Sequence, residues 1–283
     1  LRRAFDGLTT PARYGASTDG GNSQQQYGAV TGSRWASGGF MVAVDYNRTS
    51  EISARHRFYT RNLDDSATLV PGQKQISVVL AGHQRLSDTI RLEIDGQFND
   101  RRLVNALPSL ATASVFTTGN YAEPKLSSYS VTPTLRFSLP AGWETSLSGT
   151  IGKSKSDVAS SIYSQNILTT RTQLLYDNDF NGAEATAEGP LVKIAGGDIR
   201  FAAGAGYRSA TLHVKTDRTP TGGVTTTTEN VTGSRDVIFG YGELSVPLVS
   251  HANAMPLIDA LRLSGAVRYE RYKGIAGVAS PKF

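Results

Sequence analysis

The stretch TIRLEIDGQFNDR at residues 89–101 decides the fold that the sequence predicts. Its apolar and polar residues alternate, so an extended strand would have one apolar face and one polar face. The apolar set is Ile90, Leu92, Ile94 and Phe98, and the polar set is Arg91, Glu93, Asp95, Gln97 and Asn99. This segment is therefore predicted to be a strand between an apolar and a polar environment.

The same alternation recurs along the chain, at residues 40–47, 129–139, 199–208 and 261–270. No amphipathic helix of comparable length is found. The 28 Ser, 28 Thr and 29 Gly residues also favour strands and turns. Strands are expected near residues 7–16, 24–36, 39–49, 73–84, 89–101, 127–139, 143–153, 178–189, 198–215, 236–249 and 260–272, with the start of a twelfth at Ser280.

The connections between these strands alternate in length. Short turns are expected at 37–39, 85–88 and 140–142, and somewhat longer ones at 189–198 and 250–259. Long polar loops are expected at 49–72, 102–126, 157–177 and 216–234. Short turns at one end and long loops at the other are typical of an outer-membrane barrel meander, although the strand alternation alone also fits a soluble sandwich.

Aromatic residues near the strand ends fit the barrel interpretation. In a membrane barrel they would form two girdles at the interfaces; in a soluble protein they would be ordinary strand aromatics. The residues concerned are Trp35, Tyr46, Trp143, Tyr207 and Tyr269.

Several other classes of function have little support. The chain has no Cys, which excludes disulfide scaffolds, thiolate zinc sites and cysteine nucleophiles. Its net charge of +5 comes from scattered Lys and Arg rather than from a basic stripe, which argues against nucleic-acid binding. The four His residues are isolated, and no nucleophile elbow or complete dinucleotide loop occurs. No catalytic residue is predicted, and the protein is not expected to be an enzyme.

Residues 177–188 match the calcium-loop pattern, with Asp177, Asp179, Asn181, Gly182 and Glu188 in the required places. Two features oppose it. Pro190 follows too closely for an exiting helix, and the period of residues 182–188 is that of a strand. No metal site is assigned, and calcium binding at this segment stays an open alternative.

Two predicted hairpins resemble a known family. Residues 183–191 (AEATAEGPL) and 196–208 (GGDIRFAAGAGYR) resemble the "AxxGPLF…LPGGxVRLAxGxEYR" hairpin of TonB-dependent outer-membrane receptors. Residues 241–248 (YGELSVPL), 261–272 (LRLSGAVRYERY) and 280–282 (SPK) resemble that family's "YAELxVPL…LELSxAxRYExY…NPK". The resemblance covers essentially the whole chain.

The resemblance implies an all-β fold, an antiparallel transmembrane β-barrel meander of about 11 strands plus a stub, or roughly half of a 22-stranded barrel. Residues 1–283 would be a partial barrel domain, with residues 1–7 ending the connection from an N-terminal plug domain. The family's signal peptide, TonB-contacting box and plug find no counterpart in this sequence. Phe283 is expected to belong to an interrupted strand.

The implied function is TonB-dependent, energised uptake of a bulky scarce nutrient such as an iron chelate, cobalamin or a glycan, in the outer membrane of a Gram-negative bacterium. The partners would be outer-membrane lipid, the TonB complex through the plug, and a ligand captured by the extracellular loops; no nucleic acid and no cofactor are expected. Alternatives are a passive porin-like channel and a soluble β-sandwich or adhesin. The expected lumen-lining residues, which would hold the plug, are Arg91, Glu93, Asp95, Arg136, Arg200 and Arg268.

Overall fold

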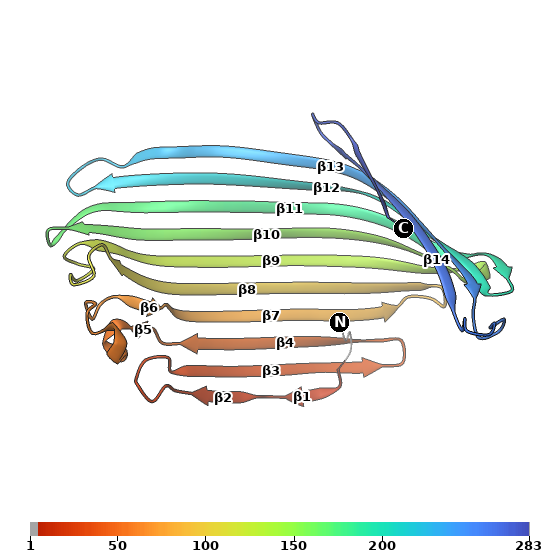
Figure 1. Cartoon of the computed structure of the whole chain (residues 1–283), viewed down its shortest axis with the longest axis horizontal. Coiled ribbons are helices and arrows are strands. Elements are labelled where there is room, and N and C mark those ends of the chain that lie inside the picture. Colours follow the sequence, from red (N-terminus) through yellow and green to blue (C-terminus); the bar gives the residue numbers. More distant parts are fainter. Residues whose placement is uncertain (1–4, 283) are drawn as a thin grey trace.

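Long antiparallel strands follow one another along the chain in the computed structural model, which describes residues 5–282 (Figure 1). The strands are β1 (Gly7–Thr9), β2 (Ala12–Gly15), β3 (Gln24–Trp35), β4 (Gly38–Thr49), β7 (Gly72–Arg85), β8 (Ile90–Pro108), β9 (Gly119–Leu139), β10 (Trp143–Ser164), β11 (Ile167–Ile194), β12 (Gly197–Pro220), β13 (Thr226–Val249), β14 (Leu261–Tyr272) and β15 (Val278–Lys282). Two short strands, β5 (Ile52–Ser53) and β6 (Thr68–Val70), pair separately, and three single-turn helices are η1 (Ala54–His56), η2 (Phe58–Thr60) and η3 (Pro140–Gly142).

The main sheet contains 13 strands in the order β1-β3-β4-β7-β8-β9-β10-β11-β12-β13-β14-β15, with β2 beside β3. β1 and β2 pair with β3 in one register and are separated at Thr10–Pro11, because proline has no N–H to donate to the ladder. The two act as one strand, so the expected number of eleven strands and a stub is confirmed. The antiparallel meander is confirmed as well.

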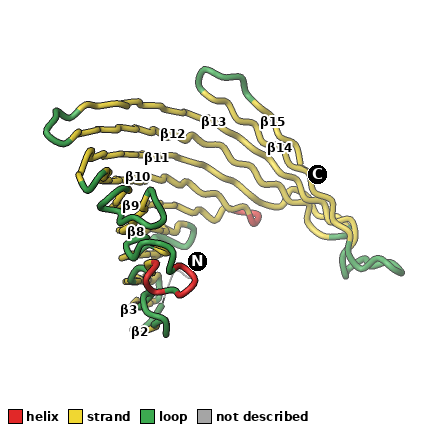
Figure 2. Tube along the Cα trace, turned by 60° about the vertical axis from the view of Figure 1, so that its left-hand side comes forward, coloured by secondary structure: helices red, strands yellow, loops and turns green. Residues whose placement is uncertain are grey.

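The sheet is one curved layer that remains open in the part of the chain that the structure describes (Figure 2). Its edges are β1–β2 on one side and β15 on the other. Gly7, at the end of the expected plug connection, begins β1, whereas residues 1–4 and Phe283 lie outside the described residues.

Strand pairing carries the predicted two faces across the whole sheet. Phe98 lies opposite Val78 on β7 and Tyr129 on β9, and Glu93 lies opposite His83 and Thr134. We call the side with Phe98 the apolar face and the side with Glu93 the polar face. The large side chains of the apolar face are exposed, among them Leu80, Ile94, Phe98, Tyr129, Val131, Leu147, Ile151, Ile238, Leu263 and Val267.

Burial follows the opposite trend to that in a soluble protein. Glu93 is only 4% exposed, and Thr134 and Ser146 on the same polar face are also buried. Isoleucines on the apolar face, by contrast, are up to 64% exposed, at Ile238. Apolar side chains normally supply the buried core, so the apolar face needs an apolar surrounding.

The prediction of long loops at 157–177 and 216–234 is wrong, because strands occupy most of both ranges. β10 and β11 run through the first range and meet in a two-residue turn at Gln165 and Asn166, and β12 and β13 occupy most of the second. Gln165 and Asn166 have φ values of 51° and 64°, as a tight hairpin turn requires. Polar residues occur on both faces of these segments, so they lack the alternation used to recognise strands.

The other two long loops are confirmed in shortened form. The 102–126 loop is reduced to residues 109–118, because β8 continues to Pro108 and β9 begins at Gly119. The 49–72 connection contains β5, η1, η2 and β6. The short turns expected at 37–39, 85–88 and 140–142 all lie at the opposite end of the sheet, which we call the short-turn end; the other is the loop end (Figure 1).

Hydrogen exchange distinguishes a strand from a loop at residues 157–177. We expect the amides of 157–164 and 167–177 to be protected, because they lie within paired strands, whereas amides of the 250–260 connection exchange quickly.

Asn166→Val should weaken the hairpin by about 1–2 kcal/mol, since a β-branched residue disfavours positive φ, and Asn166→Gly should not incur this penalty. Rapid exchange throughout 157–177 would restore the loop interpretation.

Candidate functional site

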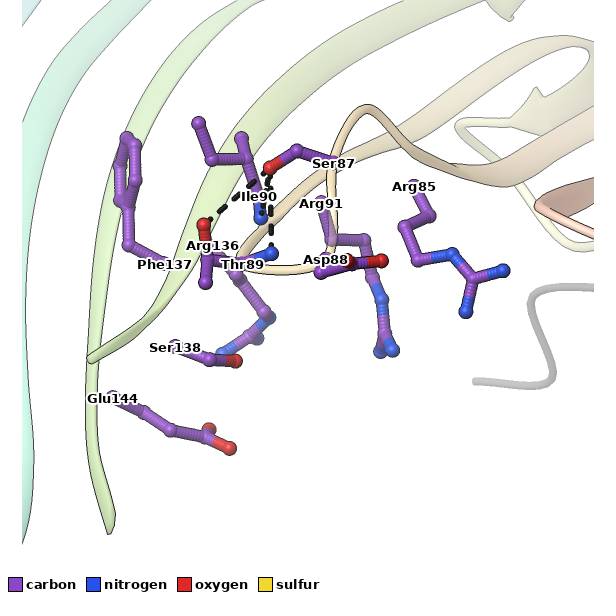
Figure 3. Close-up of a pocket in the computed structure, with 10 residues that line it drawn as sticks. All are labelled: Arg85, Ser87, Asp88, Thr89, Ile90, Arg91, Arg136, Phe137, Ser138 and Glu144. Atoms are coloured by element: carbon purple, nitrogen blue, oxygen red, sulfur yellow. Dashed lines mark hydrogen bonds between the residues drawn. The ribbon is translucent and has the colours of Figure 1, made fainter. Parts of the chain in front are cut away.

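The polar face of β8 and β9 contains an ion pair whose carboxylate is buried. Arg136 Nε donates a hydrogen bond to Glu93 Oε2 at 2.8 Å, and the Glu93 side chain is 5% exposed. Arg91 lies directly opposite Arg136, at the short-turn end of the same ladder. Figure 3 shows both arginines beside a hollow that Arg85 and Glu144 also line. Asp88 lines it as well, so three arginines and two carboxylates surround the hollow.

Asp95 lies on the same face, two residues beyond Glu93, and is opposite Ala81 and Thr132. Glu93 and Asp95 could have formed an acid–base pair, but Arg136 binds the Glu93 carboxylate. Arg91, Glu93, Asp95 and Arg136 thus lie on one face of two adjacent strands, and their charges balance.

Arg268 belongs to a second network, on β12, β13 and β14. Glu270 accepts hydrogen bonds from Arg208 Nη2 at 2.9 Å to each carboxylate oxygen, from Arg268 Nε at 2.8 Å and from Tyr272 Oη at 2.6 Å. The Arg268 guanidinium also lies 4.6 Å from the centroid of the Phe239 ring. Such charge-assisted and cation–π contacts hold both arginines in fixed positions.

Tyr241 extends this network along the polar face. Its hydroxyl donates to Glu184 Oε1 at 3.0 Å, and its ring lies 5.7 Å from the Arg268 guanidinium. Arg200 is farther towards the short-turn end, where its Nη2 lies 4.0 Å from Glu188 Oε1 and both side chains are more than half exposed. Arg200 makes a loose surface pair.

The structure thus places all six predicted polar residues on one face but in three separate groups. The sequence prediction missed Arg208, Glu270, Tyr241 and Glu184 as members of the second network. Arg208 and Glu270 could have been found, because each follows the alternation of its own strand. Phe239 and Tyr241 lie on the polar face although their rings are apolar, so hydropathy gave no signal.

The calcium-like pattern does not form a loop. Residues 177–188 lie inside β11, where about 3.3 Å per residue separates the ends of the pattern by roughly 36 Å. Lys153 Nζ pairs with Asp177 at 2.8 Å and with Asp179 at 3.3 Å on the apolar-face side, whereas Glu188 is on the other face. Within residues 5–282, no group of three His, Asp or Glu side chains is arranged to hold a metal ion.

Charged side chains occur on the apolar-face side of the strands beyond the level of Ile151. Asp217 accepts hydrogen bonds from Lys215 Nζ at 2.7 Å and from Thr227 Oγ1 at 2.6 Å. These hydrogen bonds, the lysine's first, hold the pKa of the Asp217 carboxyl below its ordinary value. The long hairpins at the loop end therefore carry paired charges on the side that is apolar lower in the sheet.

The connections at the loop end are packed together rather than separate. Val115 is completely buried, its N–H donates to Ser66 Oγ at 2.9 Å, and the Asp64 N–H donates to the Ala111 carbonyl at 2.7 Å. Arg57 joins a further connection by donating to the Gly20 carbonyl at 2.9 Å.

Aromatic side chains project from this loop assembly. Phe58 is 79% and Tyr59 67% exposed, and their rings meet edge to face at 5.5 Å. Phe116, half exposed, contacts the ring of Tyr163 at 5.3 Å. Exposed aromatic rings of this kind can bind a bulky ligand by stacking.

Among the residues that the structure describes, no helix has the length and hydropathy needed to span a membrane. No protein-family model and no curated protein sequence matches the chain.

Solved structures with the same arrangement of strands do exist. The ferric preacinetobactin receptor BauA from Acinetobacter baumannii matches 99% of this chain with a TM-score of 0.58 and 11% identity. The ferric yersiniabactin uptake receptor FyuA from Yersinia pestis matches 94% of it with a TM-score of 0.53 and 8% identity. The chain covers 44% and 45% of those two proteins, less than half of either. Both are receptors rather than enzymes. The chain therefore has the fold of part of the β-barrel of TonB-dependent receptors.

Proposed function

We propose that this chain is part of the wall of an outer-membrane receptor that takes up a bulky, scarce nutrient in a TonB-dependent manner. The observation that carries the proposal is the exposed apolar face, which is backed by a polar face that contains ion pairs. A soluble sandwich would need a second sheet over the apolar face. Within residues 5–282, the only other sheet is the two-stranded β5–β6.

The aromatic residues support a membrane-sized band on the apolar face. On β3, Trp35 adjoins the short turn and Tyr27 is eight residues away; on β9, Phe137 and Tyr129 have the same spacing. Eight residues extend about 26 Å along a strand. At the strand tilt of about 40° found in membrane barrels, this is about 20 Å along the membrane normal, close to their apolar band of about 25 Å.

Charges on the apolar-face side begin at the upper limit of this band, where Lys153 lies opposite Tyr129. Ile151 is 60% exposed, whereas Lys153, the next residue of β10 on that side, is paired with Asp177 and Asp179. Ion pairs are expensive in hydrocarbon and inexpensive in water. The hairpins beyond Lys153 would therefore project from the membrane into the external medium.

The polar face would line the lumen and hold the plug of the complete receptor. Arg91 and Arg136 beside their hollow, and the Arg208–Arg268–Glu270 network, offer charge-assisted hydrogen bonds to such a plug. Energy would come through TonB acting on the plug. An iron chelate is the preferred class of ligand, because both structural neighbours bind ferric siderophores.

A passive porin-like channel would share the strand arrangement, so uptake must be measured for the complete protein in cells. We expect deletion of the gene to abolish accumulation of a radiolabelled ferric chelate that the strain normally imports. In the complemented strain, a protonophore should stop accumulation, because energised uptake needs the proton-motive force. Uptake that persists with the protonophore would favour the passive channel.

Arginine substitutions on the two faces of β8 test the membrane contact. Ile94 and Gln97 are both exposed, so arginine at either would be tolerated in water. In a membrane, Ile94→Arg should destabilise the assembled protein by about 2–4 kcal/mol near the midplane, as should Leu92→Arg, and Gln97→Arg should have little effect. Unfolding free energies measured in lipid vesicles would check this, and equal effects of Ile94→Arg and Gln97→Arg would contradict the assigned faces.

The exposed loop aromatics are the proposed ligand contacts. Replacing both Phe58 and Tyr59 with Ala should weaken binding of the ferric chelate by roughly 10-fold or more, since each aromatic contact contributes about 0.5–1.5 kcal/mol. Ile275→Ala is the matched control, because Ile275 is equally exposed in another loop-end turn. Fluorescence titration of the complete receptor measures both, and an unchanged affinity of the Phe58/Tyr59 variant would remove these residues from the binding site.

A further inference from the structure

A row of four basic residues crosses adjacent strands on the apolar-face side, just above the aromatic band. Arg48 of β4 lies directly opposite Lys74 of β7, Lys74 lies opposite Arg102 of β8, and Arg102 lies opposite Lys125 of β9. All four side chains are exposed. We call these four residues the basic row.

The four side chains of the basic row repel one another. Residues directly opposite in neighbouring strands have Cβ atoms about 5 Å apart, and like charges at such positions destabilise a sheet. Three successive pairs of this kind, with nothing bound, are unfavourable. An anion that bridges them would remove the repulsion.

Carboxylates compensate only one half of the row. Arg102 Nε lies 3.5 Å from Asp100, and Lys125 has Glu123 on its own strand and Asp157 opposite. Arg48 and Lys74 form no ion pair within residues 5–282: the residue opposite Arg48 on β3 is Gln25, and Asp100, diagonally across from Lys74, pairs with Arg102 instead. The net positive charge is therefore centred on these two side chains.

The height of the row indicates what it faces. Tyr46 lies two residues before Arg48 on the same face, its ring stacks with Tyr27 at 6.3 Å, and Lys74 Nζ lies 5.8 Å from the centroid of the Tyr46 ring. Aromatic rings at this level belong at the membrane–water interface. The basic row is then at the level of lipid headgroups.

We propose that Arg48 and Lys74, supported by Arg102 and Lys125, form a binding site for the phosphate of an anionic lipid headgroup in the outer leaflet. This inference rests on the proposed membrane location. Guanidinium and ammonium groups on adjacent strands suit a phosphate, which accepts several charge-assisted hydrogen bonds. The lipid's acyl chains would lie on the apolar face below.

The test uses the complete receptor in dodecylmaltoside micelles, with dioleoylphosphatidylglycerol or dioleoylphosphatidylcholine added and binding measured by native mass spectrometry. The wild-type protein should prefer phosphatidylglycerol, and Arg48→Gln with Lys74→Gln should weaken that binding by about 30-fold, as the loss of two membrane-surface cations implies. The control is Lys153→Gln with Lys155→Gln. These lysines lie on the same side but opposite Asp179 and Asp177, so their removal should change the affinity much less.

Two results would contradict the proposed lipid site. Equal binding of the two lipids, or equal losses in the Arg48/Lys74 and Lys153/Lys155 variants, would overturn the site. Pyrophosphate is added at millimolar concentration as a competitor. If the protein binds pyrophosphate as tightly as it binds phosphatidylglycerol, the basic row is a site for free phosphate instead. If the double variant does not fold, Arg48→Gln and Lys74→Gln are measured singly. The micelle assay does not need bilayer insertion, so its failure is distinct from failure of the Ile94→Arg test of the membrane location.

Discussion

Backbone pairing between neighbouring strands is the constraint on which this structure depends. Side chains alternate with a period of two, so a shift of one residue in any ladder would exchange the two faces of a strand. The register shifts in the main sheet occur near strand ends, at Ile162/Tyr163, Pro190/Val192, Thr216/Asp217 and Pro247/Val249. Between those positions the register does not change, so each strand keeps the same residues on the apolar face where it would contact lipid.

The same period explains which parts of the fold the sequence could predict. Residues 89–101 alternate strictly, and their strand, its neighbours and their faces are as predicted. In residues 157–177, Ser and Thr are interspersed with apolar residues on both faces, so no regular alternation appears and the segment resembles a loop in composition. They form strands because they pair with each other in the β10–β11 hairpin and with β9 and β12 on either side, and their composition carries no signal of this pairing.

The candidate site was less predictable than the fold. Alternation placed the six selected polar residues on one face, but it could not show which of them meet. Glu93 contacts Arg136 because β8 and β9 are adjacent, whereas Glu270 gathers Arg208 from β12 and Arg268 from its own strand. Phe239 escaped prediction for another reason: it packs beneath two guanidinium groups, a polar-face role that its hydropathy conceals.

Charge is distributed unequally along the upper boundary of the apolar face. On β10–β12 the strands continue past the boundary, and their lysines meet carboxylates: Lys153 pairs with Asp177 and Lys215 with Asp217. On β4 and β7 the strands reach their loop ends at the boundary, and the corresponding positions hold Arg48 and Lys74 without such partners. If solubility at the interface were the only requirement, paired charges would suffice on β4 and β7 as they do on β10–β12. An external anion therefore contributes most at Arg48 and Lys74, because no carboxylate among the described residues pairs with them and the anion would relieve the repulsion between these opposite residues.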